Sequence, residues 1–400
     1  MRAPRTTEAG YLWYGAGVGS WFAGFGIQAV LVAHLLTNEL GISAEALGLA
    51  QTAALLPSLL FLLIGGAVAE RRDARRVLVA MHLLAALPAV ALAALVYSGA
   101  LTYWAVIAYA FALGTVNAFA MPARDSELSN VAGANMMRAV TGMTILQFAA
   151  QAVGTVGGGA GAASFGSTPV LAVQAVVLLS GALFALRLPP AEPAAPAQAA
   201  QSSLREIVDG VREVLGTPEL RHPALLVTAV GMFFIGPFLV LYPLLVRDVY
   251  GGGAAELGIV NAAFPVGTIA GSLLLRPVHI HRRGRAALLA LIAGACTLLL
   301  VSSGLPFWGL WGATLFWGMA GAVFINCSRS IFQEAAPQSH RARALSIYQL
   351  AFIGAAPLGA MLAGLCSGQI GPLATFAVYA CSMLVTVALI WSLTTTSQMR

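Results

Sequence analysis

The stretch VLVAMHLLAALPAVALAALVYS, at residues 77–98, contains no Asp, Glu, Lys or Arg. An α-helix rises about 1.5 Å per residue, so about 20 apolar residues cross the hydrocarbon core of a bilayer, which is about 30 Å thick. The residues directly before it, ERRDARR at 70–76, carry four Arg side chains, which favour the cytoplasmic face of a membrane. The stretch therefore predicts a membrane-spanning helix that begins on the cytoplasmic side.

The composition of the whole chain leads to the same class of protein. Of its 400 residues, 59% are hydrophobic and 9% are charged, and the mean hydropathy is +0.85. Soluble domains carry about 25% charged residues. The four Cys lack metal-ligand spacing, and no nucleotide-binding glycine motif or catalytic Ser/His/Asp set is present in a loop that could host it. We therefore expect an integral membrane protein that is not an enzyme and binds no cofactor, metal or nucleic acid.

Apolar runs of this kind recur along the chain, six before and six after a polar break. They cover residues 13–37, 46–69, 77–98, 102–122, 139–163, 169–187, 223–247, 255–275, 286–303, 307–328, 342–366 and 371–393. We expect an all-α integral membrane fold of twelve transmembrane helices in two six-helix halves, 1–187 and 223–400, joined by a cytoplasmic linker at 188–222. Helical spacing of apolar residues over 203–215 predicts a short amphipathic helix, lying on the membrane surface or simply solvated.

The distribution of Arg sets the predicted orientation. All 21 basic residues are Arg, and with a cytoplasmic N-terminus only Arg247 falls on the outer side. Basic residues concentrate in cytoplasmic loops. We expect a multi-pass protein of a bacterial-type inner (plasma) membrane, with both termini in the cytoplasm.

The two halves share a sequence pattern. PARDSELSNVAGANMMRA at 122–139 and SRSIFQEAAPQSHRARA at 328–344 place their Arg residues at the same separation. One constant offset relates Arg124 to Arg329, Arg138 to Arg343, Gly154 to Gly359 and Gly66 to Gly271. Several matches at one offset favour a duplicated parallel repeat, and thus two pseudo-symmetric halves.

The loop GGAVAERRDARRVL, at 65–78, resembles the signature GxLaDRxGRR of the major facilitator superfamily of transporters. Gly66 matches the motif glycine, Glu70 stands at the Asp position, and Arg71 and Arg75 supply basic residues. Asp73 departs from the general pattern in a way similar to the enterobactin-exporter and multidrug-efflux branch. The resemblance extends over the whole chain, and it implies a secondary active transporter that works by alternating access.

The resemblance implies a cytoplasmic gate around this loop. A glycine at position 66 lets the second span approach a neighbouring helix closely. Glu70 and the Arg side chains can pair with charges on facing helices, although simple anchoring at the cytoplasmic face also explains the Arg. The gating candidates are Gly66, Glu70, Arg71, Arg75, Arg124, Glu127, Arg329 and Arg343.

The resemblance also implies that spans one, four, seven and ten line a central substrate cavity, bordered by spans two, five, eight and eleven. The candidate lining residues are Trp21, Phe25, Gln28, Asn117, Met121, Gln147, Phe234, Tyr242, Trp317 and Asn326. Aromatic walls with scattered amides suit a bulky amphipathic ligand. Hydrogen bonds between helices and lipid-facing positions are the alternative for these residues.

No acidic residue falls in the middle of a span, so the proton carrier is sought among groups near the ends. His34 and Asp248, the latter beside Arg247, are the candidates for proton coupling, whereas His82 is expected to be a packed or snorkelling ring. The resulting hypothesis is a monomeric, proton-coupled exporter of a siderophore or another amphipathic small molecule. A lysophospholipid or lipid mover and a non-transporting membrane receptor remain the alternatives.

Overall fold

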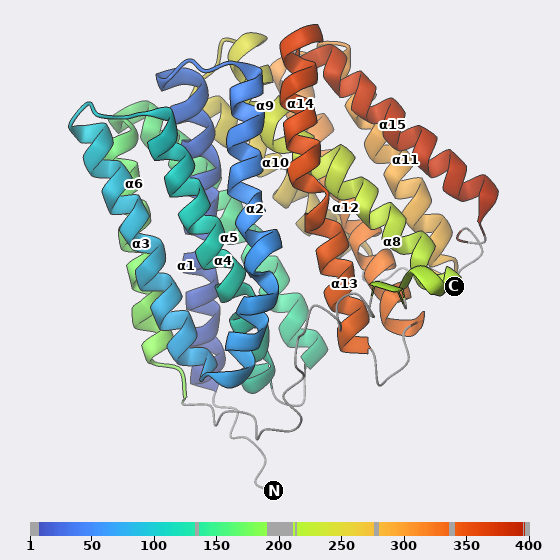
Figure 1. Ribbon diagram of the computed structural model, residues 1–400, viewed down its shortest axis with the longest axis horizontal. Helices are drawn as coiled ribbons and strands as arrows, with labels where there is room; N and C mark the ends of the chain where they lie inside the picture. The colour runs from blue at the N-terminus through green and yellow to red at the C-terminus, as the bar shows by residue number, and fades with distance from the viewer. Residues whose placement is uncertain are drawn as a thin grey trace, which may run out of the picture. The chain divides into compact units, whose positions relative to one another are not determined.

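The computed structural model describes residues 8–132, 136–189, 211–212, 214–275, 280–335, 341–394 and 396. Regular structure in this part of the chain is entirely helical (Figure 1). Within it, twelve helices are long and apolar enough to cross a membrane, which confirms the expected number of spans and the all-α fold. The amphipathic helix expected at 203–215 lies largely outside the described residues.

The first six spans follow one another with short connections. Their elements are α1 (Glu8–His34), the π-helix η1 (Leu35–Glu39), α2 (Ala44–Arg71), α3 (Ala74–Tyr97), α4 (Tyr103–Ala132), α5 (Met136–Phe165) and α6 (Ser167–Leu186). Asp73 caps α3, because its carboxylate accepts a hydrogen bond from the Arg75 backbone N–H at 3.0 Å. Gly99 and Gly166 adopt positive φ, which glycine reaches without steric strain, in the turns after α3 and α5.

Two of the remaining spans are assembled from more than one helical element. These elements are α8 (Pro218–Val230), η3 (Gly231–Ile235), α9 (Gly236–Asp248), α10 (Ala254–Leu275), α11 (Arg283–Ser302), α12 (Phe307–Ala335), α13 (Arg341–Gly354), α14 (Ala356–Ile370) and α15 (Pro372–Leu393). The seventh span runs through α8, η3 and α9. The eleventh span is interrupted at Ala355, two residues before Pro357, because proline lacks the N–H that would continue the helical hydrogen bonding.

The chain forms two compact units whose sequence limits differ from a simple division into halves. Unit 1 comprises residues 1–40, 53–201 and 253–262, and unit 2 comprises residues 41–52, 202–252 and 263–400. The start of α10 thus belongs to unit 1 and the start of α2 to unit 2. The domain limits 1–187, 188–222 and 223–400 stay a prediction.

Close contacts at glycines explain why the start of α10 packs in unit 1 and the start of α2 packs in unit 2. In unit 1, a Cβ on Gly258 of α10 would lie 3.2 Å from the Cα of Gly159 on α5. In unit 2, a Cβ on Gly48 of α2 would lie 2.9 Å from the Cα of Gly364 on α14. Only residues without a side chain let helix backbones approach this closely, which is the usual basis of tight packing between helices in lipid.

The internal repeat is visible in the packing of each unit. In unit 1, a Cβ on Gly154 of α5 would come within 2.9 Å of the Cα of Ala23 on α1. In unit 2, a Cβ on Gly359 of α14 would come within 3.0 Å of the Cα of Met232 in the seventh span. The first and fifth spans of each half therefore meet at the glycine that the sequence offset predicted.

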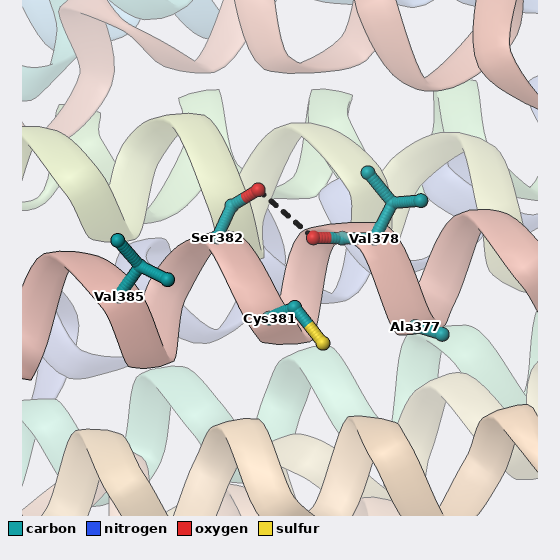
Figure 2. A pocket seen from close by; sticks show the side chains of 5 residues that line it. All are labelled: Ala377, Val378, Cys381, Ser382 and Val385. Carbon is teal, nitrogen blue, oxygen red and sulfur yellow. Dashed lines mark hydrogen bonds between the residues drawn. The ribbon is translucent and has the colours of Figure 1, made fainter.

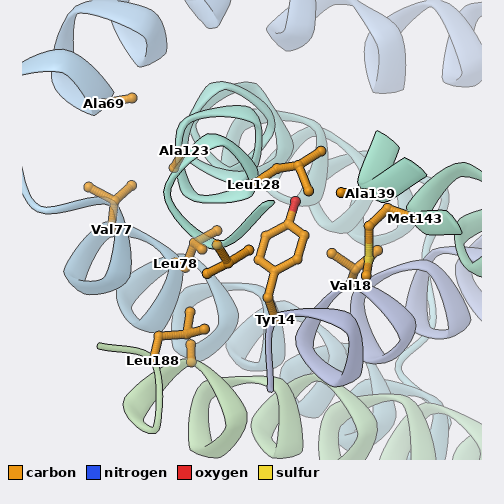
Figure 3. Packing of buried hydrophobic residues seen from close by; sticks show 12 residues of the cluster. Tyr14, Val18, Ala69, Val77, Leu78, Ala123, Leu128, Ala139, Met143 and Leu188 are labelled. Atoms are coloured by element: carbon orange, nitrogen blue, oxygen red, sulfur yellow. The ribbon is translucent and has the colours of Figure 1, made fainter. Parts of the chain in front are cut away.

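A cluster of buried apolar side chains holds α1, α3, α4 and α5 together near the start of α3. Figure 3 shows Tyr14 and Val18 from α1 facing Leu78 from α3, Leu128 from α4 and Met143 from α5. The Tyr14 hydroxyl donates to the backbone carbonyl of Arg124 at 3.0 Å. This cluster fixes the end of α4 that carries the charged candidates.

Candidate functional site

Trp21 is the centre of a polar and aromatic contact in unit 1. Its Nε1 donates to Oδ1 of Asn117 at 3.3 Å, which joins α1 to α4. The His82 ring meets the Trp21 ring edge-on, with centroids 5.1 Å apart. His82 is buried, and its Nδ1 lies 3.1 Å from the carbonyl oxygen of Leu178, so the expectation of a packed ring is confirmed.

Arg124 lies against the same aromatic surface. Its guanidinium carbon is 5.4 Å from the centre of the Trp21 ring and 4.7 Å from the centre of the Phe22 ring. Its Nε and Nη1 are buried and have no hydrogen-bond partner in the described part of the chain. Sequence reasoning placed Arg124 at a gate and missed Phe22, although the adjacent Trp-Phe pair in the first span is a visible signal.

The other predicted lining residues of unit 1 differ in exposure. Phe25 is 39% exposed, whereas Gln28, Met121 and Gln147 are half-buried. Only Trp21 and Asn117 among the candidates are joined to each other by a hydrogen bond that the structure describes.

Glu127, one turn beyond Arg124 on α4, is a buried carboxylate. Its Oε2 accepts from Asn130 Nδ2 at 3.0 Å, while its Oε1 is buried without a hydrogen-bond partner among the described residues. Asp73 and Arg75 lie close enough to interact with it electrostatically. The Nη2 of Arg75 donates to the carbonyl of Leu186 at 2.5 Å.

The predicted close approach at Gly66 is wrong by one position. Among the described residues, a Cβ on Gly66 would meet no atom within 4 Å, whereas a Cβ on neighbouring Gly65 would fall 3.0 Å from the Cα of Phe119 on α4. In the repeated copy, Gly271 does make the close approach, 2.9 Å from the Cα of Met319. Adjacent helical residues point about 100° apart, so a motif position alone does not identify the packed face.

Three gating candidates cannot be placed by their side chains. Those of Glu70, Arg71 and Arg343 lie outside the described part of the structure. Arg329, the counterpart of Arg124 in the repeat, is described and is exposed on α12.

Unit 2 gathers its aromatic candidates into one cluster. Trp317 lies 5.4 Å from Phe234 and 6.2 Å from Tyr242, measured between ring centroids, and the Tyr242 hydroxyl is 2.9 Å from Oγ1 of Thr314. These three rings are buried. Two half-buried rings complete the cluster and were missed: Phe238 and Phe264, at 5.7 and 5.1 Å from Trp317. Phe234, Phe238 and Tyr242 recur every four residues, so helical spacing was the signal.

The last lining candidate, Asn326, is exposed and donates from Nδ2 to the carbonyl of Ala322 in its own helix at 2.8 Å. It is not part of the aromatic cluster. Farther along α12, Glu334 forms an ion pair with Arg283.

The two proton-coupling candidates have different surroundings. In unit 1, Nε2 of His34 is 3.9 Å from Oε1 of Glu39, which also accepts a hydrogen bond from Ser167. In unit 2, Asp248 pairs with Arg247 at 2.5 and 3.1 Å, as expected, and Nη1 of Arg247 donates to the carbonyl of Ile42 at 2.9 Å. Nδ1 of His34 is buried and has no hydrogen-bond partner among the described residues.

A surface hollow on α15 is lined mainly by apolar side chains and contains none of the predicted site residues. Figure 2 shows it lined by Ala377, Val378, Cys381, Ser382 and Val385, all from this one helix. The Ser382 hydroxyl donates to the Val378 carbonyl at 2.9 Å, so its polar group is satisfied within the helix. The hollow therefore offers no unpaired hydroxyl to a polar ligand.

Comparisons with known proteins agree with this architecture. The chain is 28% identical over 377 residues to the multidrug efflux pump Tap of Mycolicibacterium fortuitum, covering 90% of both chains. It resembles the solved structure of the D-xylose-proton symporter with a TM-score of 0.77 and 16% identity, covering 95% of this chain and 97% of the other. It resembles the nucleoside transporter NupG with a TM-score of 0.76 and 14% identity, covering 96% and 99%.

The family is established by a match over most of the chain. The model of the Major Facilitator Superfamily matches residues 14–352, and again residues 225–399. The twelve candidate spans and the solved structures have the fold that this match implies. The chain is therefore a multi-pass membrane transporter, and it belongs to the Major Facilitator Superfamily.

Proposed function

We propose that this protein is a proton-coupled exporter of amphipathic small molecules in a bacterial-type inner membrane. The observation that carries the proposal is the similarity to a multidrug efflux pump over 90% of both chains. That relative favours a drug-like substrate over a siderophore, for which no relative gives support. In this proposal both termini are cytoplasmic, as the Arg distribution predicts.

The aromatic groups of the two units support an amphipathic substrate. Unit 1 offers Trp21 with the amide of Asn117, and unit 2 offers the half-buried rings Phe238 and Phe264 beside Trp317. Aromatic faces bind apolar ring systems, and a few convergent polar groups give them orientation. These are the residues that we propose contact the transported molecule.

Charged residues near the loop that joins α2 and α3 support a gating role. Arg75 and Glu127 attract each other electrostatically, and Glu127 is buried on α4. A buried charge interaction of this kind depends strongly on the separation of the two groups. We propose that Glu70, Glu127 and the surrounding Arg side chains change partners as the cytoplasmic side opens and closes.

Coupling requires a group that titrates while it is exposed to each side in turn. His34 beside Glu39 and Asp248 beside Arg247 are the proposed carriers. The test is efflux of amphipathic dyes of different charge from proteoliposomes with an imposed pH gradient, with and without an uncoupler. We expect efflux to depend on the gradient and to stop with the uncoupler. Efflux that ignores both would contradict the antiporter and favour a facilitator or lipid mover.

A further inference from the structure

We infer that the exported molecule is an amphipathic organic anion, and that Arg124 binds its carboxylate or sulfonate group while Trp21 and Phe22 support its apolar part. This inference rests on the proposed function and names its substrate class. It begins from an unusual property of Arg124: a cation packed on two rings, with buried donors that the described residues leave unsatisfied.

The internal repeat provides a comparison for Arg124 within the same chain. Arg329 occupies the corresponding position in the second half and is exposed, as expected for an Arg that only anchors a cytoplasmic end. The paired glycine contacts relate Ala23 to Met232, which places Val230 and Gly231 at the positions of Trp21 and Phe22, and neither residue offers a ring to a cation. The aromatic platform is therefore specific to the first half, and positive-inside anchoring does not account for it.

The energetics of Arg124 favour a missing partner. An aromatic face attracts a cation through its ring quadrupole, and the attraction is stronger when the cation is desolvated. That contact leaves the N–H groups of the guanidinium unpaired, and a buried donor without a hydrogen-bond partner is unfavourable. Nε and Nη1 are two such donors. An oxyanion is the partner that guanidinium groups bind best, since its oxygens accept several N–H bonds in one plane.

The position of Arg124 connects it to the predicted substrate surface. Asn117, Met121 and Arg124 follow one another at helical spacing on one face of α4. Trp21 links the two ends of this row, because it accepts the guanidinium on its ring and donates its Nε1 to Asn117. The row thus offers an apolar and aromatic surface that ends in a cation, which is complementary to a molecule with an apolar ring body and one anionic group.

The experiment compares two dyes of opposite charge on the purified full-length protein in detergent and in proteoliposomes. Fluorescein is the anionic probe and ethidium the cationic probe, and binding is followed by fluorescence anisotropy. The test variant is Arg124→Gln, and the control is Arg285→Gln, because Arg285 is exposed and belongs to no candidate gating or lining group. Arg124→Lys retains the charge but not the planar donor set.

We expect fluorescein to bind wild type and the Arg285→Gln variant equally. Its affinity should fall at least tenfold in Arg124→Gln and less in Arg124→Lys, with ethidium binding unchanged or tighter. Unchanged fluorescein binding in Arg124→Gln, or equal loss of both dyes, would overturn the inference. So would wild-type protein that fails to bind fluorescein. Fluorescein binding that depends on Arg124, together with flux that ignores the pH gradient, would instead contradict only the proposed proton coupling.

Discussion

Substitution of Gly154 by Ala tests whether the glycine contacts hold α1 and α5 together. A Cβ at position 154 would lie 2.9 Å from the Cα of Ala23, whereas carbon atoms pack best at about 3.5–4.0 Å. The carbonyl oxygen of Ala23 would be nearer still, so the two helices would have to separate by roughly 1 Å along a closely packed interface. Overpacking of this size costs about 1–3 kcal/mol of stability.

The control for this variant is three residues away on the same helix. Gly157 is exposed, and a Cβ there would meet nothing within 4 Å. Alanine gains about 0.8–1 kcal/mol of helix propensity over glycine at either position, so the difference between Gly154→Ala and Gly157→Ala isolates the steric cost. Apparent melting temperature in detergent, followed by tryptophan fluorescence, is the assay.

We expect Gly157→Ala to melt at or slightly above the wild-type temperature and Gly154→Ala to melt below both. One kcal/mol corresponds to about 2–4 °C for folding units of 150–250 residues, so the two variants should differ by at least about 2 °C. If Gly154→Ala melts together with Gly157→Ala, the α1–α5 interface tolerates a methyl group and the argument from glycine contacts fails.

Three further experiments test other parts of the structure. Trp317→Ala should lower the free energy of unfolding by about 3–5 kcal/mol, because the Trp317 ring is 4% exposed within the aromatic cluster. Trp308 is 70% exposed, so Trp308→Ala should change the melting temperature little. Equal losses of stability in the two variants would contradict the packing of the cluster. In a cysteine-free background, Gly252→Cys should react with an impermeant thiol reagent from outside and Arg285→Cys should not, and the reverse pattern would overturn the orientation. Gly66→Leu should insert and fold, since a Cβ at position 66 meets no described atom within 4 Å, yet it should lose most dye efflux. Wild-type efflux from this variant would argue against a gating role for Gly66.

The membrane-spanning helices were predictable from local sequence, because the thickness and the apolar core of the bilayer set their length and polarity, and other parts of the chain do not. Arg-rich loops and apolar runs identified every one of the twelve spans. The glycines at 154 and 359 were predictable for a related reason. Duplicated helices retain their tightest contacts, and each of the two glycines meets the first span of its own half, at Ala23 and at Met232.

Sequence reasoning was less successful at predicting which residues of a helix face a partner, because the partner helix lies far away in the sequence. It placed the close contact of α2 at Gly66, although the neighbouring Gly65 faces α4. It identified Trp317 and Tyr242 but not Phe264, whose place in the cluster is decided by the packing of α10 against α12. The rotation of a helix about its axis is set by the partners it meets, and a single sequence contains no direct record of those partners.

Arg124 and Arg329 show most clearly what the sequence determines and what only the tertiary structure determines. From the sequence alone, Arg124 and Arg329 are equivalent: each follows a span of the same order, and both satisfy the distribution expected of cytoplasmic ends. Only the tertiary structure distinguishes them, since it places Arg124 over Trp21 and Phe22 and leaves Arg329 exposed. The physical reason is that burial and pairing are properties of a side chain's neighbours in space. Those of Arg124 come from α1, about one hundred residues earlier in the chain.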